Sequence, residues 1–411
     1  MSKRTAFFFA FLVILPLCIV NIHPVNASEE SWAPKASMPT ARSGLGVAVV
    51  DGNIYVIGGS RGINVGYDNN EEYNLITDTW TTKTAMPTPR GVFAIAVFQN
   101  KVYCIGGSIR GGTGFNELTN VNEVYNPATD TWETKAPMPM LKSSFLANVV
   151  DGKIYIIGGL TQSAPNATLY PSNETFVYDP LLDSWTTKAS IPTPVYSYAS
   201  SVVDNKVYVI SGNHYGYTDL NQIYDPTTDT WSYGAPIPIA VQSASAGATT
   251  GITASKAIYV VGGFVGFVSP VNLTQVYFPE NDTWSSGAAM STARYGLGVA
   301  VVNDLLYAIG GSPFLYQPDL NLNEQYTPLG YTATSPSPFP SLSTSPITSP
   351  PSSASPTTFP SSSEQTSQSP EPKTNDALHT ELIFASLAVA VIITIITCVL
   401  VLRKGRKTIY V

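Results

Sequence analysis

Short apolar runs rich in β-branched residues alternate with polar stretches along residues 30–330 of this chain. In the first unit, a run over 44–50 is joined to a second run over 53–57 by the tight turn Asp51-Gly52. A longer polar stretch follows, and then two further runs over 71–74 and 79–84. Apolar runs of this length bounded by turn residues predict four antiparallel strands, which we name a, b, c and d. Because one such unit cannot bury its own apolar face, it needs neighbours of the same kind.

Glycine and aromatic positions repeat in phase with these runs. A glycine doublet ends strand b in most units, is reduced to Ser211-Gly212 in one, and returns at a spacing of about 50 residues. The doublet glycines are Gly58, Gly59, Gly106, Gly107, Gly158, Gly159, Gly212, Gly262, Gly263, Gly310 and Gly311. A tyrosine occurs in each strand c, and tryptophans mark strand d at Trp32, Trp80, Trp132, Trp185, Trp231 and Trp284. We expect the aromatic rings to fill the space between successive units, and the glycines to allow a positive φ or a close backbone approach.

This combination of glycine doublet, tyrosine and tryptophan resembles the kelch repeat family, over roughly residues 30–330. The resemblance implies an all-β fold, a β-propeller whose blades are four-stranded antiparallel sheets, and the six glycine doublets predict six blades. It says little about activity, because one architecture hosts many functions. No doublet forms the glycine-rich element that binds phosphate at the start of a helix.

The two ends of the repeat region complete each other. The last strand-c tyrosine, Tyr326, has no tryptophan after it, and Trp32 has no tyrosine or glycine doublet before it. We therefore expect the strand around Trp32 to pair with the strand around Tyr326 and to close the last blade of a ring. Closure would remove the exposed sheet edges that recruit other chains.

The residues before the repeats have the features of an export signal. Lys3 and Arg4 precede an apolar run, and small residues at 25–27 suit a cleavage site. Residues 1–27 are therefore predicted to be a signal peptide, with an uncleaved membrane anchor or a lipid-modified Cys18 as the less favoured alternatives.

The residues after the predicted propeller, which spans 28–331, divide into three further segments. Residues 332–378 are dominated by Ser, Thr and Pro, and predict a disordered stalk suited to O-glycosylation. Residues 379–402 are predicted to be a transmembrane helix, because the uncharged apolar run at 382–402 is long enough to cross a bilayer. The basic tail at 403–411 is expected to stay in the cytoplasm, which makes a single-pass cell-membrane protein with an extracellular propeller.

Composition adds two constraints. The net charge of the chain is −7. Without the six positive charges of the signal and the tail, the predicted extracellular part has a net charge of about −13, which argues against general nucleic-acid binding. Cys104 is the single cysteine of 28–331, so no disulfide can form within that region. We expect it to be a buried, unreactive thiol.

The antiparallel meander places the b-to-c loops and the d-to-a junctions on one face of the disc. A basic residue occurs at a fixed offset in the d-to-a junction of four neighbouring blades, and valines replace it at Val195 and Val241. Together with residues of two b-to-c loops, they form an arc that we interpret as ligand-binding: Arg42, Arg61, Arg90, Arg110, Phe115, Lys142 and Arg294. Arginines beside aromatic residues are frequent at binding hot spots. The alternative is structural, with each basic side chain bonding to carbonyls and carboxylates of adjacent blades.

Four sequons follow the predicted signal and are candidates for N-glycosylation: Asn166, Asn173, Asn272 and Asn281. The first three lie in b-to-c loops, and Asn281 lies in a c-to-d turn on the opposite face. Glycans at the first three would cover part of the face that lacks the basic residues.

The residue inventory excludes several catalytic sites. His214 is the single histidine between Trp32 and Tyr331, so a multi-histidine metal site cannot form, and the Cys-Tyr copper site of kelch-type galactose oxidases lacks its parts. We expect no metal, no cofactor and no catalytic residues. Six-bladed kelch sialic acid mutarotases need only acid, base and anion-binding groups, so an enzyme of that kind remains the alternative. Glu117 is then a candidate for the acid or base, although no motif selects it.

The sequence thus favours a cell-surface binding module that recognises an extracellular protein or polysaccharide through the b-to-c and d-to-a loops. We expect the propeller to be monomeric and to bind no nucleic acid. An intracellular ubiquitin-ligase adaptor, common among kelch proteins, is disfavoured because no further N-terminal domain precedes the repeats.

Overall fold

The computed structural model describes residues 29–61, 65–112, 114–163, 167–266, 269–314 and 317–333. The predicted signal peptide, membrane helix and tail, and nearly all of the predicted stalk, lie outside these residues. Where the chain is described, it contains no helix that is long and apolar enough to span a bilayer.

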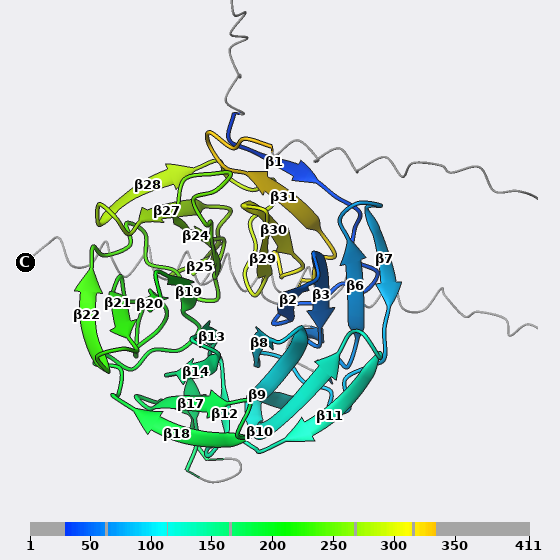
Figure 1. Cartoon of the computed structure of the whole chain (residues 1–411), viewed down its shortest axis with the longest axis vertical. Helices are drawn as coiled ribbons and strands as arrows, with labels where there is room; N and C mark the ends of the chain where they lie inside the picture. Colours follow the sequence, from blue (N-terminus) through cyan, green and yellow to red (C-terminus); the bar gives the residue numbers. More distant parts are fainter. Residues whose placement is uncertain are drawn as a thin grey trace, which may run out of the picture. The chain divides into compact units, whose positions relative to one another are not determined.

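The described residues form six four-stranded antiparallel sheets, arranged around a central axis (Figure 1). We number them in chain order. The first contains β2 (Gly46–Val50), β3 (Asn53–Ile57), β6 (Asn70–Asn74) and β7 (Thr79–Thr82), and the second β8 (Ala94–Phe98), β9 (Lys101–Gly112), β10 (Gly114–Asn126) and β11 (Thr131–Lys135). The third contains β13 (Ala147–Val150), β14 (Lys153–Ile157), β17 (Thr175–Asp179) and β18 (Ser184–Lys188), and the fourth β19 (Ala199–Val203), β20 (Lys206–Ile210), β21 (Asn221–Asp225) and β22 (Thr230–Gly234). The fifth contains β23 (Ser245–Ala248), β24 (Ile258–Val261), β27 (Thr274–Phe278) and β28 (Thr283–Gly287), and the sixth β29 (Gly298–Val302), β30 (Leu305–Ile309), β31 (Asn323–Thr327) and β1 (Ser31–Pro34).

Short strands also form in the loops that follow strand b and in one d-to-a junction. In the b-to-c loops they are β4 (Ser60–Arg61) with β5 (Val65–Gly66), β15 (Leu160–Thr161) with β16 (Tyr170–Pro171), and β25 (Phe264–Val265) with β26 (Ser269–Pro270). β12 (Lys142–Ser143) lies in the d-to-a junction before the third sheet and pairs with β15. They extend the face of the disc on which the b-to-c loops lie.

The sixth sheet joins the two ends of the described chain. β1 pairs antiparallel with β31, and Trp32 lies opposite Tyr326, as predicted. The Trp32 indole N–H donates to the carbonyl of Ala288 at 2.8 Å, which links β1 to the connection after the fifth sheet. The other strand-d tryptophans make the same bond to the preceding sheet: Trp80 to Ala36, Trp132 to Thr84, Trp185 to Ala136, Trp231 to Ala189 and Trp284 to Ala235.

Neighbouring sheets are packed through apolar side chains and through the tyrosines of strand c. Tyr73 is fully buried, stacks on Trp80 with ring centroids 5.0 Å apart, and donates its hydroxyl to Asp78 at 2.6 Å. The doublet glycines lie where backbones meet. A Cβ on Gly58, whose φ is +58°, would lie 2.7 Å from the carbonyl oxygen of Arg90, so no larger residue fits there without a shift.

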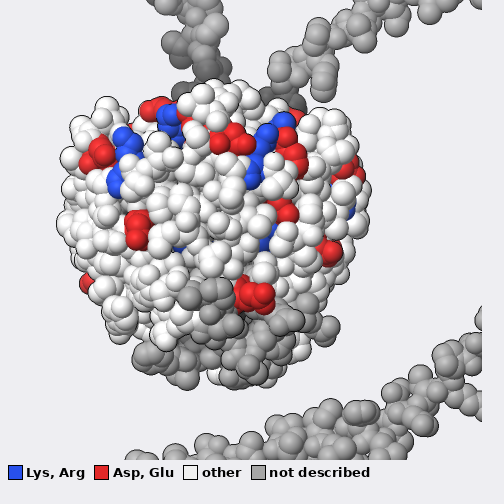
Figure 2. Space-filling model, turned by 90° about the horizontal axis from the view of Figure 1, so that it is seen from below, with Lys and Arg blue, Asp and Glu red and all other residues white. Residues whose placement is uncertain are grey.

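Several described surface ion pairs lie at one face of the disc, which we call the charged face. Ion pairs such as Lys101–Glu133 and Lys153–Asp179 lie beside the a-to-b and c-to-d turns. Seen from the side, charged residues gather along one edge, and most of the remaining described surface is uncharged (Figure 2). Because Ser31 lies opposite Thr327 at the c-to-d end of β31, both ends of the ring leave from the charged face.

Candidate ligand-binding site

A closed cycle of backbone hydrogen bonds surrounds the axis on the face of the b-to-c loops. Each sheet contributes one residue from just before its strand a, and the N–H of each residue donates to the carbonyl of its neighbour at 2.7–2.9 Å. The members, in ring order, are Gly44, Val92, Ser144, Ser197, Ser243 and Gly296. All six have φ between +47° and +62°, the left-handed conformation, and each N–H donates to the residue of the preceding sheet in the ring. We call these residues the axial ring.

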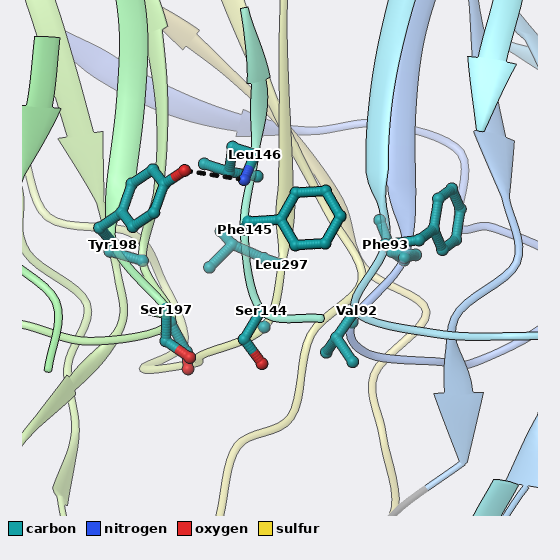
Figure 3. A pocket seen from close by; sticks show the side chains of 13 residues that line it. Val92, Phe93, Ser144, Phe145, Leu146, Ser197, Tyr198 and Leu297 are labelled. Atoms are coloured by element: carbon teal, nitrogen blue, oxygen red, sulfur yellow. Dashed lines mark hydrogen bonds between the residues drawn. The ribbon is translucent and has the colours of Figure 1, made fainter. Parts of the chain in front are cut away.

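The axial ring forms the mouth of a cavity of about 520 Å³, including its open end, that all six sheets line. The next residues along the chain lie deeper and are largely apolar: Leu45, Phe93, Phe145, Leu146, Tyr198, Ala244 and Leu297. Figure 3 shows Ser144, Ser197 and Val92 in one layer, and the rings of Phe93, Phe145 and Tyr198 in the layer beyond it. The Tyr198 hydroxyl is already used, because it donates to the Ile157 carbonyl and accepts from the Leu146 N–H.

The three serines of the axial ring are consecutive. Their side chains are half-buried, and none of their hydroxyls has a hydrogen-bond partner within the described residues. The hydroxyls of Ser144 and Ser197 lie on the side of the ring away from the aromatic layer (Figure 3). These hydroxyls are therefore available to a ligand as donors or acceptors.

The basic residues of the predicted arc lie inside the sheets instead. Arg42, Arg90 and Arg294 are fully buried, and each is paired with a buried glutamate of strand c. Arg42 bonds Glu71 at 2.5 Å and the Val56 carbonyl at 2.9 Å. Arg90 pairs with Glu123, and Arg294 lies 2.7 Å from Glu324. These three side chains occupy the positions of the structural alternative and present no charge at the mouth.

Lys142 occupies the same position in the third sheet with other partners. It is fully buried, donates to the Gly158 carbonyl at 3.0 Å and to Ser172 Oγ at 2.6 Å, and lies 4.9 Å from the Phe176 ring centroid. Burial lowers the pKa of Lys142 to about 8, against the opposing effect of the Glu174 carboxylate 3.5 Å away. Lys142 therefore also offers no surface charge.

The fourth and fifth sheets replace the ion pair by a neutral pair. Val195 stands in the arginine position, and Gln222 stands where the first sheet has Glu71. The Gln222 side chain accepts from the Thr193 N–H at 2.9 Å and donates to the Thr193 carbonyl at 3.0 Å. Val241 and Gln275 repeat the arrangement, with Gln275 bonded to both backbone groups of Ile239. The same place in each sheet thus holds either Arg with Glu or Val with Gln, and Lys142 is the exception.

The remaining members of the predicted arc are placed only by their backbones. Arg61 lies in β4, Arg110 in β9 and Phe115 in β10, and their side chains fall outside the description. Their loops follow strand b, on the same face as the cavity.

The described residues contain no cluster of His, Cys, Asp or Glu that could hold a metal ion. His214 Nδ1 lies 2.7 Å from the Pro194 carbonyl oxygen. Cys104 is fully buried, and burial raises its thiol pKa to about 12, so it is no nucleophile at neutral pH. Glu117 is exposed in β10 and is not among the residues that line the cavity.

The axial ring was missed by sequence reasoning, although a signal for it existed. Each of its members lies two residues after a position of the basic arc, as Ser144 follows Lys142 and Ser197 follows Val195. The fixed offset of the basic residues in the d-to-a junctions therefore indicated the correct segment of each unit. The residue that faces the axis was two positions further on.

The repeated sheets, the tyrosine and tryptophan phase and the axial ring define a kelch β-propeller. The Kelch motif profile matches residues 41–87, and the Attractin/LZTR1 β-propeller profile matches residues 111–325. The latter covers more than half of the chain, which belongs to this propeller family.

Relatives and solved structures agree with this class. Kelch-like protein 23 of Homo sapiens is 30% identical over 205 residues, which cover 50% of this chain and 34% of that protein. The Kelch-like protein terF of Aspergillus terreus is 38% identical over 99 residues, covering 24% of this chain and 21% of that protein. The chain thus spans about a third or less of the length of these relatives. The solved structure titled "Structure of YjhT" has a TM-score of 0.60 at 18% identity and covers 70% of this chain and 95% of its own, which shows the shared fold.

Proposed function

We propose that this protein is a cell-surface binding module, a closed six-bladed kelch propeller that takes its ligand at the mouth of the axial cavity. The observation that carries the proposal is the cavity itself, which residues from all six sheets line on the face of the b-to-c loops. Variable loops on a rigid scaffold are where binding sites are usually built. Concave, largely apolar sites with a few polar groups are typical of ligand pockets.

The lining favours binding over catalysis. Among the described residues around the cavity there is no carboxylate, no basic side chain and no histidine. Tyr198 is its one titratable side chain, and burial raises the pKa of that hydroxyl above its usual value. A sialic acid mutarotase would need an acid, a base and a cation for the sugar carboxylate, and the arginines expected to supply the cation are bonded to glutamates.

The position of the chain ends supports a surface role. β1 begins and β31 ends at the face opposite the cavity, so both ends of the described ring lie away from the mouth. The predicted signal peptide, Ser/Thr/Pro-rich stalk and C-terminal apolar run are the sequence features from which we infer the location. An extracellular protein or a glycan is then the expected ligand, and kelch relatives favour a protein.

The proposal is tested with full-length protein screened against panels of extracellular proteins and glycans. The variant Ser197→Phe places an aromatic ring across the mouth at a half-buried position, and Ile252→Ala, 80% exposed at an a-to-b connection on the other face, is its control. Binding that is lost in Ser197→Phe and kept in Ile252→Ala supports the site. Faster interconversion of free sialic acid anomers in NMR spectra, abolished by Ser197→Phe, would instead establish the enzyme.

A further inference from the structure

The axial mouth has two unlike halves. The third, fourth and fifth sheets contribute Ser144, Ser197 and Ser243, whereas the sixth, first and second contribute Gly296, Gly44 and Val92. Hydrogen-bonding side chains therefore line one half of the rim. In the other half the ring backbone is already paired, because each N–H and each carbonyl belongs to the cycle.

The layer below the rim is an apolar collar. Leu45, Phe93, Phe145 and Leu297 are nearly fully buried and line the cavity on the first, second, third and sixth sheets. This apolar lining disfavours a charged ligand group in the cavity, because a charge placed there would lose its hydration without gaining a partner. The buried cations among the described residues are Arg42, Arg90, Arg294 and Lys142, and each is already bonded to acceptors within its own sheet.

We infer that the cavity receives an uncharged, apolar side chain at the tip of a partner protein's loop, while the loop's peptide groups bond to the three serine hydroxyls. This inference rests on the proposed function and names the class of ligand for that site. The apolar lining made by Leu45, Phe93, Phe145 and Leu297 suits an aromatic or branched aliphatic side chain. Peptide N–H and C=O groups beside that side chain suit hydroxyls, which can donate and accept.

A sugar ring matches the mouth less well. Its hydroxyl groups point outwards all around the ring, so a sugar would need polar partners on both halves of the rim. The Gly44, Val92 and Gly296 half supplies no side-chain donor or acceptor. A loop tip, in contrast, has one apolar end and one polar edge, which is the asymmetry of the site.

The experiment uses a displayed library of disulfide-closed random peptides, selected on full-length protein and counter-selected on Ser197→Phe. The selected peptides are expected to share one Phe, Trp, Leu or Ile at the tip. Replacing that residue by Asp should abolish binding. The triple variant Ser144→Ala, Ser197→Ala, Ser243→Ala should weaken binding by about a hundredfold, because each lost hydrogen bond weakens it by roughly fivefold. Ile252→Ala should bind like the wild type, and melting temperatures verify that the variants are folded.

Three results would overturn the inference. Selected tips that carry Asp, Glu, Lys or Arg would refute the uncharged class, and unchanged affinity in the triple serine variant would refute the role of the hydroxyls. Binding of neutral methyl hexosides that is lost in the triple variant would replace the protein loop by a sugar while leaving the site intact. If neither peptides nor sugars distinguish the wild type from Ser197→Phe, the proposed function itself fails.

Discussion

Replacing the buried ion pair of the first sheet by the neutral pair of the fourth is the most decisive test of how this ring is stabilised. Arg42 and Glu71 lie 2.5 Å apart, and their side chains are 0% and 2% exposed. Arg42→Val alone leaves the Glu71 carboxylate buried without its partner. Arg42→Val with Glu71→Gln recreates the combination of Val195 and Gln222, which the chain already uses.

The structure sets the expected magnitudes. Removing one partner of a buried ion pair costs about 3–5 kcal/mol, because the other charge stays desolvated, and this applies to either single variant. In the double variant no charge is left, and Gln at position 71 can bond the N–H and carbonyl of Thr40 as Gln222 bonds those of Thr193. The remaining loss is the packing of the longer arginine side chain. We expect the double variant to lose about 1–2 kcal/mol, well below the sum of the singles.

Urea denaturation of the full-length protein, followed by tryptophan fluorescence, measures the free energies of unfolding of the wild type and the three variants. Lys206→Ala is the control, because Lys206 and Asp225 form an exposed pair at 3.7 Å and should contribute little. If the losses of the two single variants add up in the double variant, the neutral pair does not substitute for the ion pair and the reasoning is refuted.

Three further predictions concern closure, modification and pH. Deleting Ser28–Met38 removes β1 and leaves β31 as an open edge, so the melting temperature should fall and light scattering should rise; an unchanged melting temperature would contradict closure. When the protein is secreted from a eukaryotic host, mass spectrometry should find a glycan on the exposed Asn281 and none on Asn272, whose Nδ2 donates to the Met290 carbonyl at 3.0 Å; a modified Asn272 would show that this bond does not form. Burial alone would raise the pKa of Asp304, but hydrogen bonds from residues 250–254 lower it to about 2. The stabilisation of the folded state by the ionised Asp304 is therefore complete above the unfolded-state pKa near 4 and is lost as the pH falls through 2. Asp304→Asn should therefore unfold at lower urea than the wild type at pH 7, with a difference that shrinks towards pH 2; a gap that does not change with pH would refute this account.

Much of the scaffold could be predicted because its causes are local. The first unit was expected at 44–50, 53–57, 71–74 and 79–84, and its strands run over 46–50, 53–57, 70–74 and 79–82. Strand a starts two residues later than expected, because Gly44 adopts a φ of +58° and belongs to the axial ring, and strand d ends two residues earlier. The pairing of β1 with β31 was predicted because Trp32 has no strand-c tyrosine before it and Tyr326 has no tryptophan after it. The predicted signal, stalk and membrane helix stay predictions.

The candidate site was harder to predict because it depends on which way a side chain points. Arg42, Arg90 and Arg294 recur on the correct face, and their period alone cannot distinguish a surface arc from a set of buried pairs. The missing information was in strand c, where the units with arginine carry Glu71, Glu123 and Glu324, and the units with valine carry glutamine. Reading both positions together would have indicated internal pairing. The cavity itself arises from six distant segments, which no local pattern brings together.

The pairing of β1 with β31 also determines how the ring would respond to mechanical tension. β31 lies between β30 and β1, so the strand through which the chain leaves towards its C-terminus has a hydrogen-bonded neighbour on each side. A pull between the axial mouth and residue 327 acts along β31, and antiparallel hydrogen bonds lie perpendicular to that direction. All the bonds of both ladders are then loaded together in shear instead of breaking one after another. Tension applied between the axial mouth and residue 327 would therefore load the strand pair that also closes the ring.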